Sequence, residues 1–274
     1  MNDSVDKYKY LLILSSTIQF TLAVLAIRFI INLYSSVLMY WISISYVYRP
    51  FGNTYQSVAM GNWTDFRVFI VFGFGALFLC IFGILLVRKL NSTKSLEWSF
   101  RLMLTWLAFI MVNMLPFSMA AAVLFYDDFG FSFTNLFELM IVRALLAIIA
   151  IVIAIYFRTT WLWLFMRSSY SIHLIDSQSK QKQFIRRIFI IPWFLGSLLL
   201  SLFTFLPYRY WSWFLIIILM GLVILPVFNF SFPERTPRLN RSDKSVLENS
   251  HRFLAYLLIL IALFAFSYFR ISVL

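Results

Sequence analysis

The sequence predicts an all-α protein, a polytopic transmembrane helical bundle with about seven crossings. Of its 274 residues, 62% are hydrophobic and 12% are charged, and the mean hydropathy is +0.86. A soluble domain carries roughly 25% charged residues, so this chain has too few polar side chains to cover a water-soluble globule. Its apolar runs are continuous and reach the roughly 20 residues that a membrane helix needs. Transmembrane barrels instead show short alternating segments.

The first apolar stretch is unusually long. We expect a single transmembrane domain over 1–274 whose first crossing covers about 10–34, with an extension to residue 48. Arg28 is the only charge in this stretch, and no Gly or Pro near it offers a turn. One crossing followed by a bent, re-entrant or interfacial extension is therefore our expectation. Two crossings, which would place the amino terminus outside, are the alternative.

Six further crossings follow, separated by polar or basic segments. We expect them at about 68–87, 102–125, 136–157, 188–206, 212–229 and 253–269. Pro116 lies inside the crossing at 102–125 and predicts a kink there. Ser245 and Glu248 have the spacing of a capping box that leads into the last helix.

Basic residues orient the predicted bundle. The loops 88–101, 158–187 and 230–252 carry four, six and five Lys or Arg residues, whereas the intervening loop 126–135 carries none. Lys and Arg collect on the cytoplasmic side of membrane proteins. We therefore expect a cytoplasmic amino terminus, a periplasmic carboxyl terminus and a multi-pass location in a bacterial inner membrane. The net charge of +12 then indicates anionic membrane lipid as a partner and gives no support to nucleic acid.

Residues suited to catalysis are sparse. Both histidines, His173 and His251, lie in predicted basic loops, and the one cysteine, Cys80, lies inside an apolar run. A metal site needs several His, Cys or acidic ligands that converge. We predict no catalytic, metal-binding or cofactor-binding residues, and the sequence leans against an enzyme without deciding the question.

Polar side chains within the predicted crossings are the better candidates for function, because such residues are costly in hydrocarbon and usually meet a partner or a water-filled cavity. The candidates for contacts with another helix or subunit are Arg28, Asn113, Glu138 and Arg143. Arg28 could instead reach the outer interface, and Glu138 could lie at that interface as well. Glu138 and Arg143 are five residues apart, which is too far round a helix for the favoured i,i+4 pair.

The predicted membrane surfaces have candidates too. Lys182, Arg186 and Arg187 are candidate contacts to anionic lipid on the cytoplasmic face. Six tryptophans fall near predicted span ends and are expected to form interfacial belts. They are Trp41, Trp63, Trp98, Trp161, Trp163 and Trp211.

Two short motifs carry a family resemblance. Residues 73–76 (GFGA) open the second crossing, and residues 113–116 (NMLP) stand in the third. In this order they resemble the small-residue helix and the N-x-x-P motif of the site-2 proteases, the zinc-dependent, M50-like intramembrane family. Where that family has H-E-x-x-H, residues 32–41 read NLYSSVLMYW, and where it has L-D-G, residues 120–122 read AAA.

The resemblance covers about residues 25–125 and lacks every metal ligand of the family. It implies a protease scaffold without zinc, which cannot activate water and would bind rather than cut. The chain is also similar to uncharacterised polytopic membrane proteins of Bacteroidota that share the W-L-x₅-N pattern of residues 106–113.

Three functions follow as hypotheses. The first is a non-catalytic subunit or scaffold of a bacterial inner-membrane complex, whose partners are other membrane subunits and membrane lipids. The second is a transporter of a small molecule or lipid, since helices kinked at Pro116, Pro192 and Pro226, together with buried Arg residues, could line a pathway. The third is a divergent intramembrane hydrolase.

Overall fold

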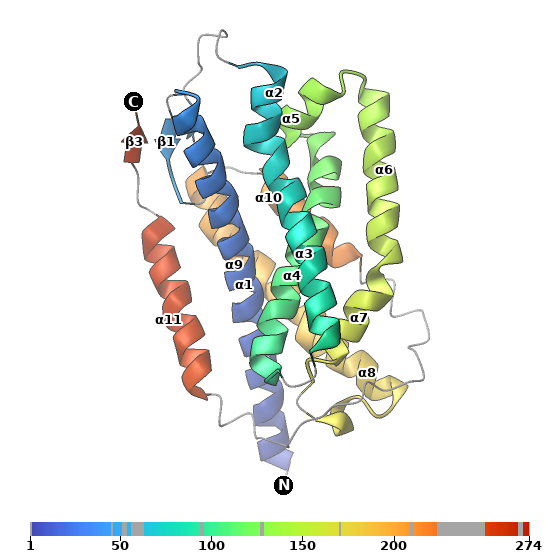
Figure 1. The fold of residues 1–274 in the computed structure, drawn as a ribbon. Helices are drawn as coiled ribbons and strands as arrows, with labels where there is room; N and C mark the ends of the chain where they lie inside the picture. Colours follow the sequence, from blue (N-terminus) through green and yellow to red (C-terminus); the bar gives the residue numbers. More distant parts are fainter. Residues whose placement is uncertain are drawn as a thin grey trace.

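The computed structural model shows an all-α helical bundle with a small sheet at one end (Figure 1). It describes residues 2–44, 46–50, 54–55, 63–93, 96–126, 129–169, 171–208, 211–223, 250–267 and 271–273. The amino terminus and the last strand lie at opposite ends of the bundle, which we call the amino-terminal and carboxyl-terminal ends. The predicted capping box at 245–248 and most of the predicted loop 230–252 lie outside the described residues.

The long helices lie side by side along the bundle axis (Figure 1). The first half of the chain forms α1 (Asn2–Trp41), β1 (Tyr46–Tyr48), β2 (Thr54–Tyr55), α2 (Asp65–Val68), the π-helix η2 (Phe69–Gly73), α3 (Phe74–Ser92), α4 (Trp98–Ala122) and α5 (Phe129–Leu136). The second half forms α6 (Met140–Tyr156), α7 (Arg158–Met166), the 3₁₀ helix η3 (Ile172–Leu174), α8 (Gln178–Ile185), the π-helix η4 (Arg186–Ile190), α9 (Ile191–Tyr208), α10 (Trp211–Leu222), α11 (Ser250–Ser267) and β3 (Ile271–Val273).

A helix occupies each of the seven segments in which a crossing was expected. Within the described residues, five helical stretches are long and apolar enough to cross a membrane. They are Tyr10–Trp41, Asp65–Ser92, Trp98–Ala122, Met140–Met166 and Gln178–Leu202. Two shorter apolar helices, Trp211–Leu222 and Leu254–Leu263, complete the set. The expected all-α class is confirmed.

Helix α1 differs from the expected bent segment, because it continues without a break from Asn2 to Trp41. The 32 residues from Tyr10 to Trp41 extend about 48 Å at 1.5 Å per residue, which exceeds a hydrocarbon core of about 30 Å. The missing bend has a physical reason. No Gly or Pro interrupts the helix, and α4, α9 and η2 pack along its length.

The chain after α1 turns sharply instead of continuing as an interfacial helix. Ser43 has a positive φ of 57°, Ser43 N–H donates to Tyr40 O, and Ile44 N–H donates to Met39 O. These two bonds form a Schellman motif, which satisfies the last carbonyl groups of the helix. The turn delivers the chain into β1 at the carboxyl-terminal end.

A three-stranded antiparallel sheet, in the order β2-β1-β3, lies at this end of the bundle (Figure 1). Val47 of β1 pairs with Thr54 on one side and with Ser272 on the other. The last strand is therefore hydrogen-bonded to the segment that directly follows α1. The sequence analysis expected a bent, re-entrant or interfacial extension up to residue 48. The chain does turn after α1, but residues 46–48 form a strand, which the sequence analysis did not predict.

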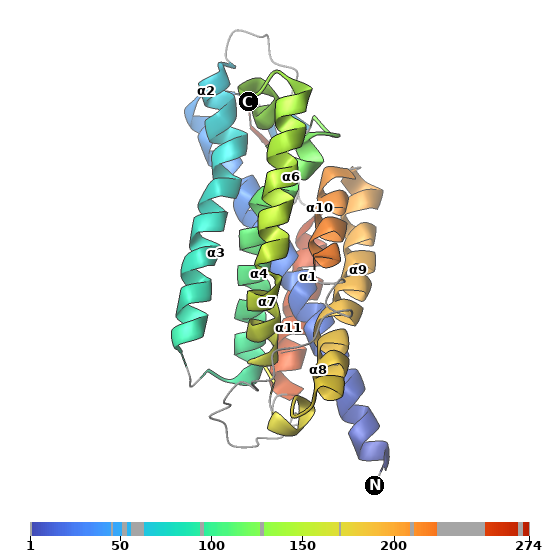
Figure 2. The same cartoon turned by 90° about the vertical axis from the view of Figure 1, so that its right-hand side faces the viewer.

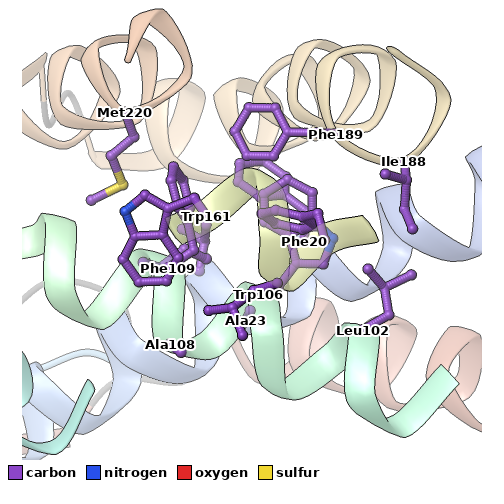
Figure 3. Close-up of a cluster of buried hydrophobic side chains, with 14 of the residues drawn as sticks. Phe20, Ala23, Leu102, Trp106, Ala108, Phe109, Trp161, Ile188, Phe189 and Met220 are labelled. Atoms are coloured by element: carbon purple, nitrogen blue, oxygen red, sulfur yellow. The ribbon is translucent and has the colours of Figure 1, made fainter. Parts of the chain in front are cut away.

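The core lies where α1, α4, α7 and η4 meet, and it is rich in aromatic rings. Trp106 stacks on Phe189 with ring centroids 4.9 Å apart and lies 4.8 Å from both Phe20 and Phe165. Figure 3 shows Phe20, Trp106, Trp161 and Phe189 gathered between the helices. Trp106, Phe165 and Phe189 are completely buried, so this level of the bundle is filled by side chains.

Helix α1 also satisfies backbone groups of its neighbours. Pro192 has no N–H and cannot donate to the carbonyl of Ile188, four residues back in η4. Ser16 Oγ donates to that carbonyl at 2.6 Å and accepts from Trp106 Nε1 at 3.0 Å. The hydroxyl thus joins α1 to both η4 and α4.

The other π-helix, η2, is also joined to α1 by side-chain hydroxyl groups. The Tyr34 hydroxyl donates to Ile70 O and Ser35 Oγ donates to Val71 O, each at 2.9 Å. A π-helix disturbs the regular i→i−4 ladder, so its carbonyl groups are open to outside donors. Both π-helices therefore lie where α1 presents hydroxyl groups.

A side chain from a neighbouring helix also replaces the missing backbone donor at Pro116 inside α4. The proline cannot donate to Val112 O, and Cys80 Sγ of α3 donates to this carbonyl at 3.6 Å. Helix α4 continues through Pro116 as one helix from Trp98 to Ala122, and the expected kink stays a prediction.

Ser16→Ala should lower the free energy of unfolding by about 1–3 kcal/mol, because Ile188 O and Trp106 Nε1 both lose a partner in a buried site. Ser118→Ala is the matched control, since Ser118 Oγ is also buried but has no hydrogen-bond partner among the described residues. It should leave stability nearly unchanged. Denaturant titration in a mild detergent measures both, and equal costs would refute the role given to Ser16.

Candidate functional site

A sizeable cavity in the described part of the chain is an apolar groove on the side of the bundle. It has a volume of about 620 Å³ and lies over α4, between α3 on one side and α6 and α7 on the other. Figure 2 shows α3 and α6 on either side of α4. We call it the α3–α6 groove, and it is lined among others by Cys80, Ile84, Arg88, Asn113, Pro116, Leu146, Ala150, Ala154, Thr160 and Trp161.

The floor of the groove carries the polar groups of α4. Asn113 is 1% exposed, and its Nδ2 donates to Phe109 O at 2.8 Å within the same helix. Beside it the Cys80 thiol donates a hydrogen bond to the carbonyl oxygen of Val112. Most polar groups here are thus satisfied locally, which leaves a largely apolar surface. The sequence singled out Asn113, and the structure places it in the lining of this groove.

The amino-terminal end of the groove is more polar. Arg88, near the end of α3, is exposed and forms no ion pair with any described residue. Thr160 and Trp161 of α7 line the same cavity. The Trp161 indole N–H is buried without an acceptor among the described residues. Trp161 was expected in an interfacial belt, but it is only 2% exposed and packs on Phe109 at 5.2 Å.

Arg143 lies near the carboxyl-terminal end, in the first turns of α6. Its side chain is 5% exposed, Nη1 donates to Thr134 Oγ1 of α5 at 2.8 Å, and the guanidinium lies 5.8 Å from the Tyr126 ring. These contacts join α6 to α5 and to the segment that precedes α5, and a contact of Arg143 with another subunit stays a prediction. Glu138 is exposed in the loop before Met140, where α6 begins, so it lies outside the helix in which the sequence analysis had placed it.

Arg28 is enclosed by the bundle rather than positioned at the outer interface. The residue is 1% exposed, and its guanidinium carbon lies 4.6 Å from the centroid of the Trp213 ring on α10. A cation over an indole face is attracted by the ring quadrupole, more strongly when both are desolvated. Arg28 thereby contributes to the contact between α1 and α10.

The amino-terminal end of the bundle is basic. Lys182 and Arg187 are half-buried and Arg186 is exposed where α8 continues into η4, which leaves their role as anionic-lipid contacts a prediction. Lys180 donates to Asp176 at 2.8 Å, and this hydrogen bond holds the pKa of the Asp176 carboxyl below its ordinary value.

Two arginines donate hydrogen bonds to carbonyl groups at the carboxyl-terminal end of α3, which lies at the amino-terminal end of the bundle. Arg101 donates to Leu90 O and Thr93 O, and Arg167 donates to Asn91 O at 3.0 Å. These carbonyl groups lack donors within the helix, and positive charge is favourable at a helix carboxyl terminus. Part of the basic character of this end is therefore used to hold α3, α4 and α7 together.

A second, much smaller cavity lies where the protease-like motifs meet. It has a volume of about 30 Å³, room for about one water molecule. Ile31 of α1, Ala76 of α3, and Ser118 and Ala121 of α4 line it. Across the described residues, no three His, Cys, Asp or Glu side chains form a group that could hold a metal ion.

The chain matches no family model, no curated protein and no solved structure. The resemblance to the site-2 proteases thus stays a prediction that rests on its motifs.

Thr134→Val should lower the free energy of unfolding by about 1–2 kcal/mol, because it removes the acceptor of the buried Arg143 while keeping the side-chain shape. Thr134→Ser keeps the hydroxyl and should retain most of the stability. The comparison is made by thermal unfolding in detergent at fixed pH. If the two variants are equally destabilised, the bond to Arg143 contributes nothing measurable.

Proposed function

We propose that this chain is a non-catalytic integral membrane subunit or scaffold of a bacterial inner-membrane complex. In this proposal it crosses the membrane seven times, with its amino terminus in the cytoplasm and its carboxyl terminus in the periplasm. Other membrane subunits and membrane lipids are its partners.

The unequal burial of the long apolar helices carries the proposal. In the most apolar part of α1, 72% of residues are buried inside the bundle, whereas the value for the α6–α7 stretch is only 17%. The outward face of α6 is formed by large apolar side chains that are each more than half exposed. These are Leu145, Ile148, Ile149, Val152, Ile153 and Tyr156. An apolar face of this kind requires lipid or another helix to cover it.

The location of basic residues supports the proposed orientation. Helix α3 ends, and α4 and α8 begin, at the amino-terminal end of the bundle (Figure 1). Arg88, Lys89, Arg101, Lys180 and Lys182 lie at these helix ends. The positive-inside rule assigns such an end to the cytoplasm.

A lipid transporter is the second candidate, and the α3–α6 groove favours it. The filled aromatic core argues against a route through the centre of the bundle, because Trp106, Phe165 and Phe189 occupy that level. The groove itself opens at the side. A reconstituted vesicle assay with fluorescent phospholipid separates the candidates, since a scaffold should not accelerate movement of lipid between leaflets.

The third candidate, a divergent hydrolase, depends on the resemblance to the site-2 proteases. The cavity of about 30 Å³ between the matching segments leaves little room for a substrate peptide. Stoichiometric zinc in the purified protein would favour this candidate over the scaffold.

The orientation can be tested by cysteine labelling in a Cys80→Ala background, because Cys80 is the only cysteine. Val5→Cys should react with a membrane-impermeant maleimide only after cells are opened. Glu138→Cys, in the exposed loop before α6, should react in intact cells. The reverse pattern, or labelling of both sites in intact cells, would contradict the proposed topology.

The scaffold role predicts that the outward face of α6 contacts another protein. A photo-crosslinking amino acid at Val152, which is 60% exposed on α6, should give discrete protein adducts in native membranes. Leu258 on α11, 65% exposed and on another side of the bundle (Figure 1), is the matched control and should give lipid adducts. No protein adduct at Val152, together with a monodisperse monomer in mild detergent, would count against a subunit.

A further inference from the structure

We propose that the α3–α6 groove binds one acyl chain of an anionic phospholipid, whose phosphate contacts Arg88. The lipid would come from the leaflet at the amino-terminal end of the bundle. The inference shares the membrane location and orientation with the proposed function, but it does not depend on a protein partner.

The length of the groove suits a single leaflet. Its lining extends along α3 from Cys80 to Arg88 and along α6 and α7 from Leu146 to Trp161. At 1.5 Å per residue these distances are about 12 and 22 Å. The hydrocarbon of one leaflet is about 15 Å thick, so an acyl chain of ordinary length matches the groove.

The walls of the groove suit a hydrocarbon chain. Ala150 and Ala154 place small side chains on α6, and Pro116 on α4 lacks an N–H. Because this proline cannot donate to the carbonyl oxygen of Val112, that oxygen accepts a hydrogen bond from the Cys80 thiol instead. A flexible chain therefore meets apolar atoms along most of the groove, and its burial requires little loss of polar solvation.

The charged end of the groove determines the kind of lipid. Arg88 lines the cavity, is exposed, and makes no ion pair with any described residue. Thr160 and Trp161 line the same cavity. The Trp161 indole N–H is buried without an acceptor among the described residues. Guanidinium, hydroxyl and indole groups are donors, and phosphate and ester groups of a phospholipid supply acceptors. Anionic lipids are abundant in the cytoplasmic leaflet, to which the basic end is assigned.

Lys89 provides an internal control for the charge. It neighbours Arg88 on α3 and has the same charge, but it does not line the groove. Ala150 and Val152 form a second matched pair on α6, because Ala150 lines the groove and Val152 faces outward.

The test is native mass spectrometry of the full chain, titrated with phosphatidylglycerol or phosphatidylcholine in mild detergent. We expect one tightly retained phosphatidylglycerol. Arg88→Gln should reduce the preference for phosphatidylglycerol about tenfold, as for loss of one charge-assisted hydrogen bond, and Lys89→Gln should reduce it less than about twofold. Ala150→Phe should abolish retention of both lipids by filling the groove, and Val152→Phe should not.

Equal effects of Arg88→Gln and Lys89→Gln would overturn the proposal, since they would indicate only a diffuse attraction to a basic surface. Undiminished binding in Ala150→Phe would overturn it as well. A photo-crosslinker at Ala150 that captures a protein rather than lipid would assign the groove to a partner helix and refute the lipid site. Thermal unfolding of each variant without lipid verifies folding. The crosslinking at Val152 tests the scaffold role independently of the lipid titration. A negative result for the lipid site would therefore leave the scaffold proposal unaffected.

Discussion

The architecture depends on a single constraint: a carbonyl group buried among apolar side chains needs a hydrogen-bond donor. Prolines and π-helices remove or displace the donors that a regular α-helix supplies. In this bundle the replacements come from neighbouring helices, as when Ser16 donates to Ile188 O and Ser35 donates to Val71 O. The position of α1 is thereby tied to specific backbone atoms of its neighbours and not only to apolar contact.

The central position of α1 has consequences for function. Ser16, Gln19 and Ser35 of α1 hydrogen-bond to neighbouring helices. The aromatic cluster around Trp106 fills the space at the level of Ser16. The open apolar surfaces described above therefore lie at the side of the bundle. Helix α6 keeps an exposed apolar face, and the α3–α6 groove opens beside it with Arg88 at one end.

Much of the fold could be predicted from the sequence, because continuous apolar runs determine helices independently of their partners. All seven expected segments contain a helix. The sheet could not be predicted, since Val47 pairs with Ser272 across more than two hundred residues and three-residue strands have no local signal. The first helix is longer than the expected crossing 10–34, because tertiary contacts and hydroxyl groups sustain it to Trp41, and the chain turns only after that residue.

The candidate site was predictable only in part. Asn113, Arg28 and Arg143 stand out as polar residues in apolar runs, but their partners Phe109 O, Trp213 and Thr134 are visible only in three dimensions. The groove itself left no trace in the sequence. It results from the spacing of α3 and α6 over α4. Trp161 was expected at an interface because it follows a predicted span end, but it is buried by packing that no local pattern reveals.

The central claim is that α1 supplies the donor that a proline removes, and a double-mutant cycle between Ser16 and Pro192 tests it most directly. Pro192→Ala restores an N–H that can donate to Ile188 O within its own helix. If the account is correct, Ser16→Ala costs clearly less unfolding free energy in the Pro192→Ala background than in the native chain. An equal cost in both backgrounds would contradict it, because the two residues would then act independently.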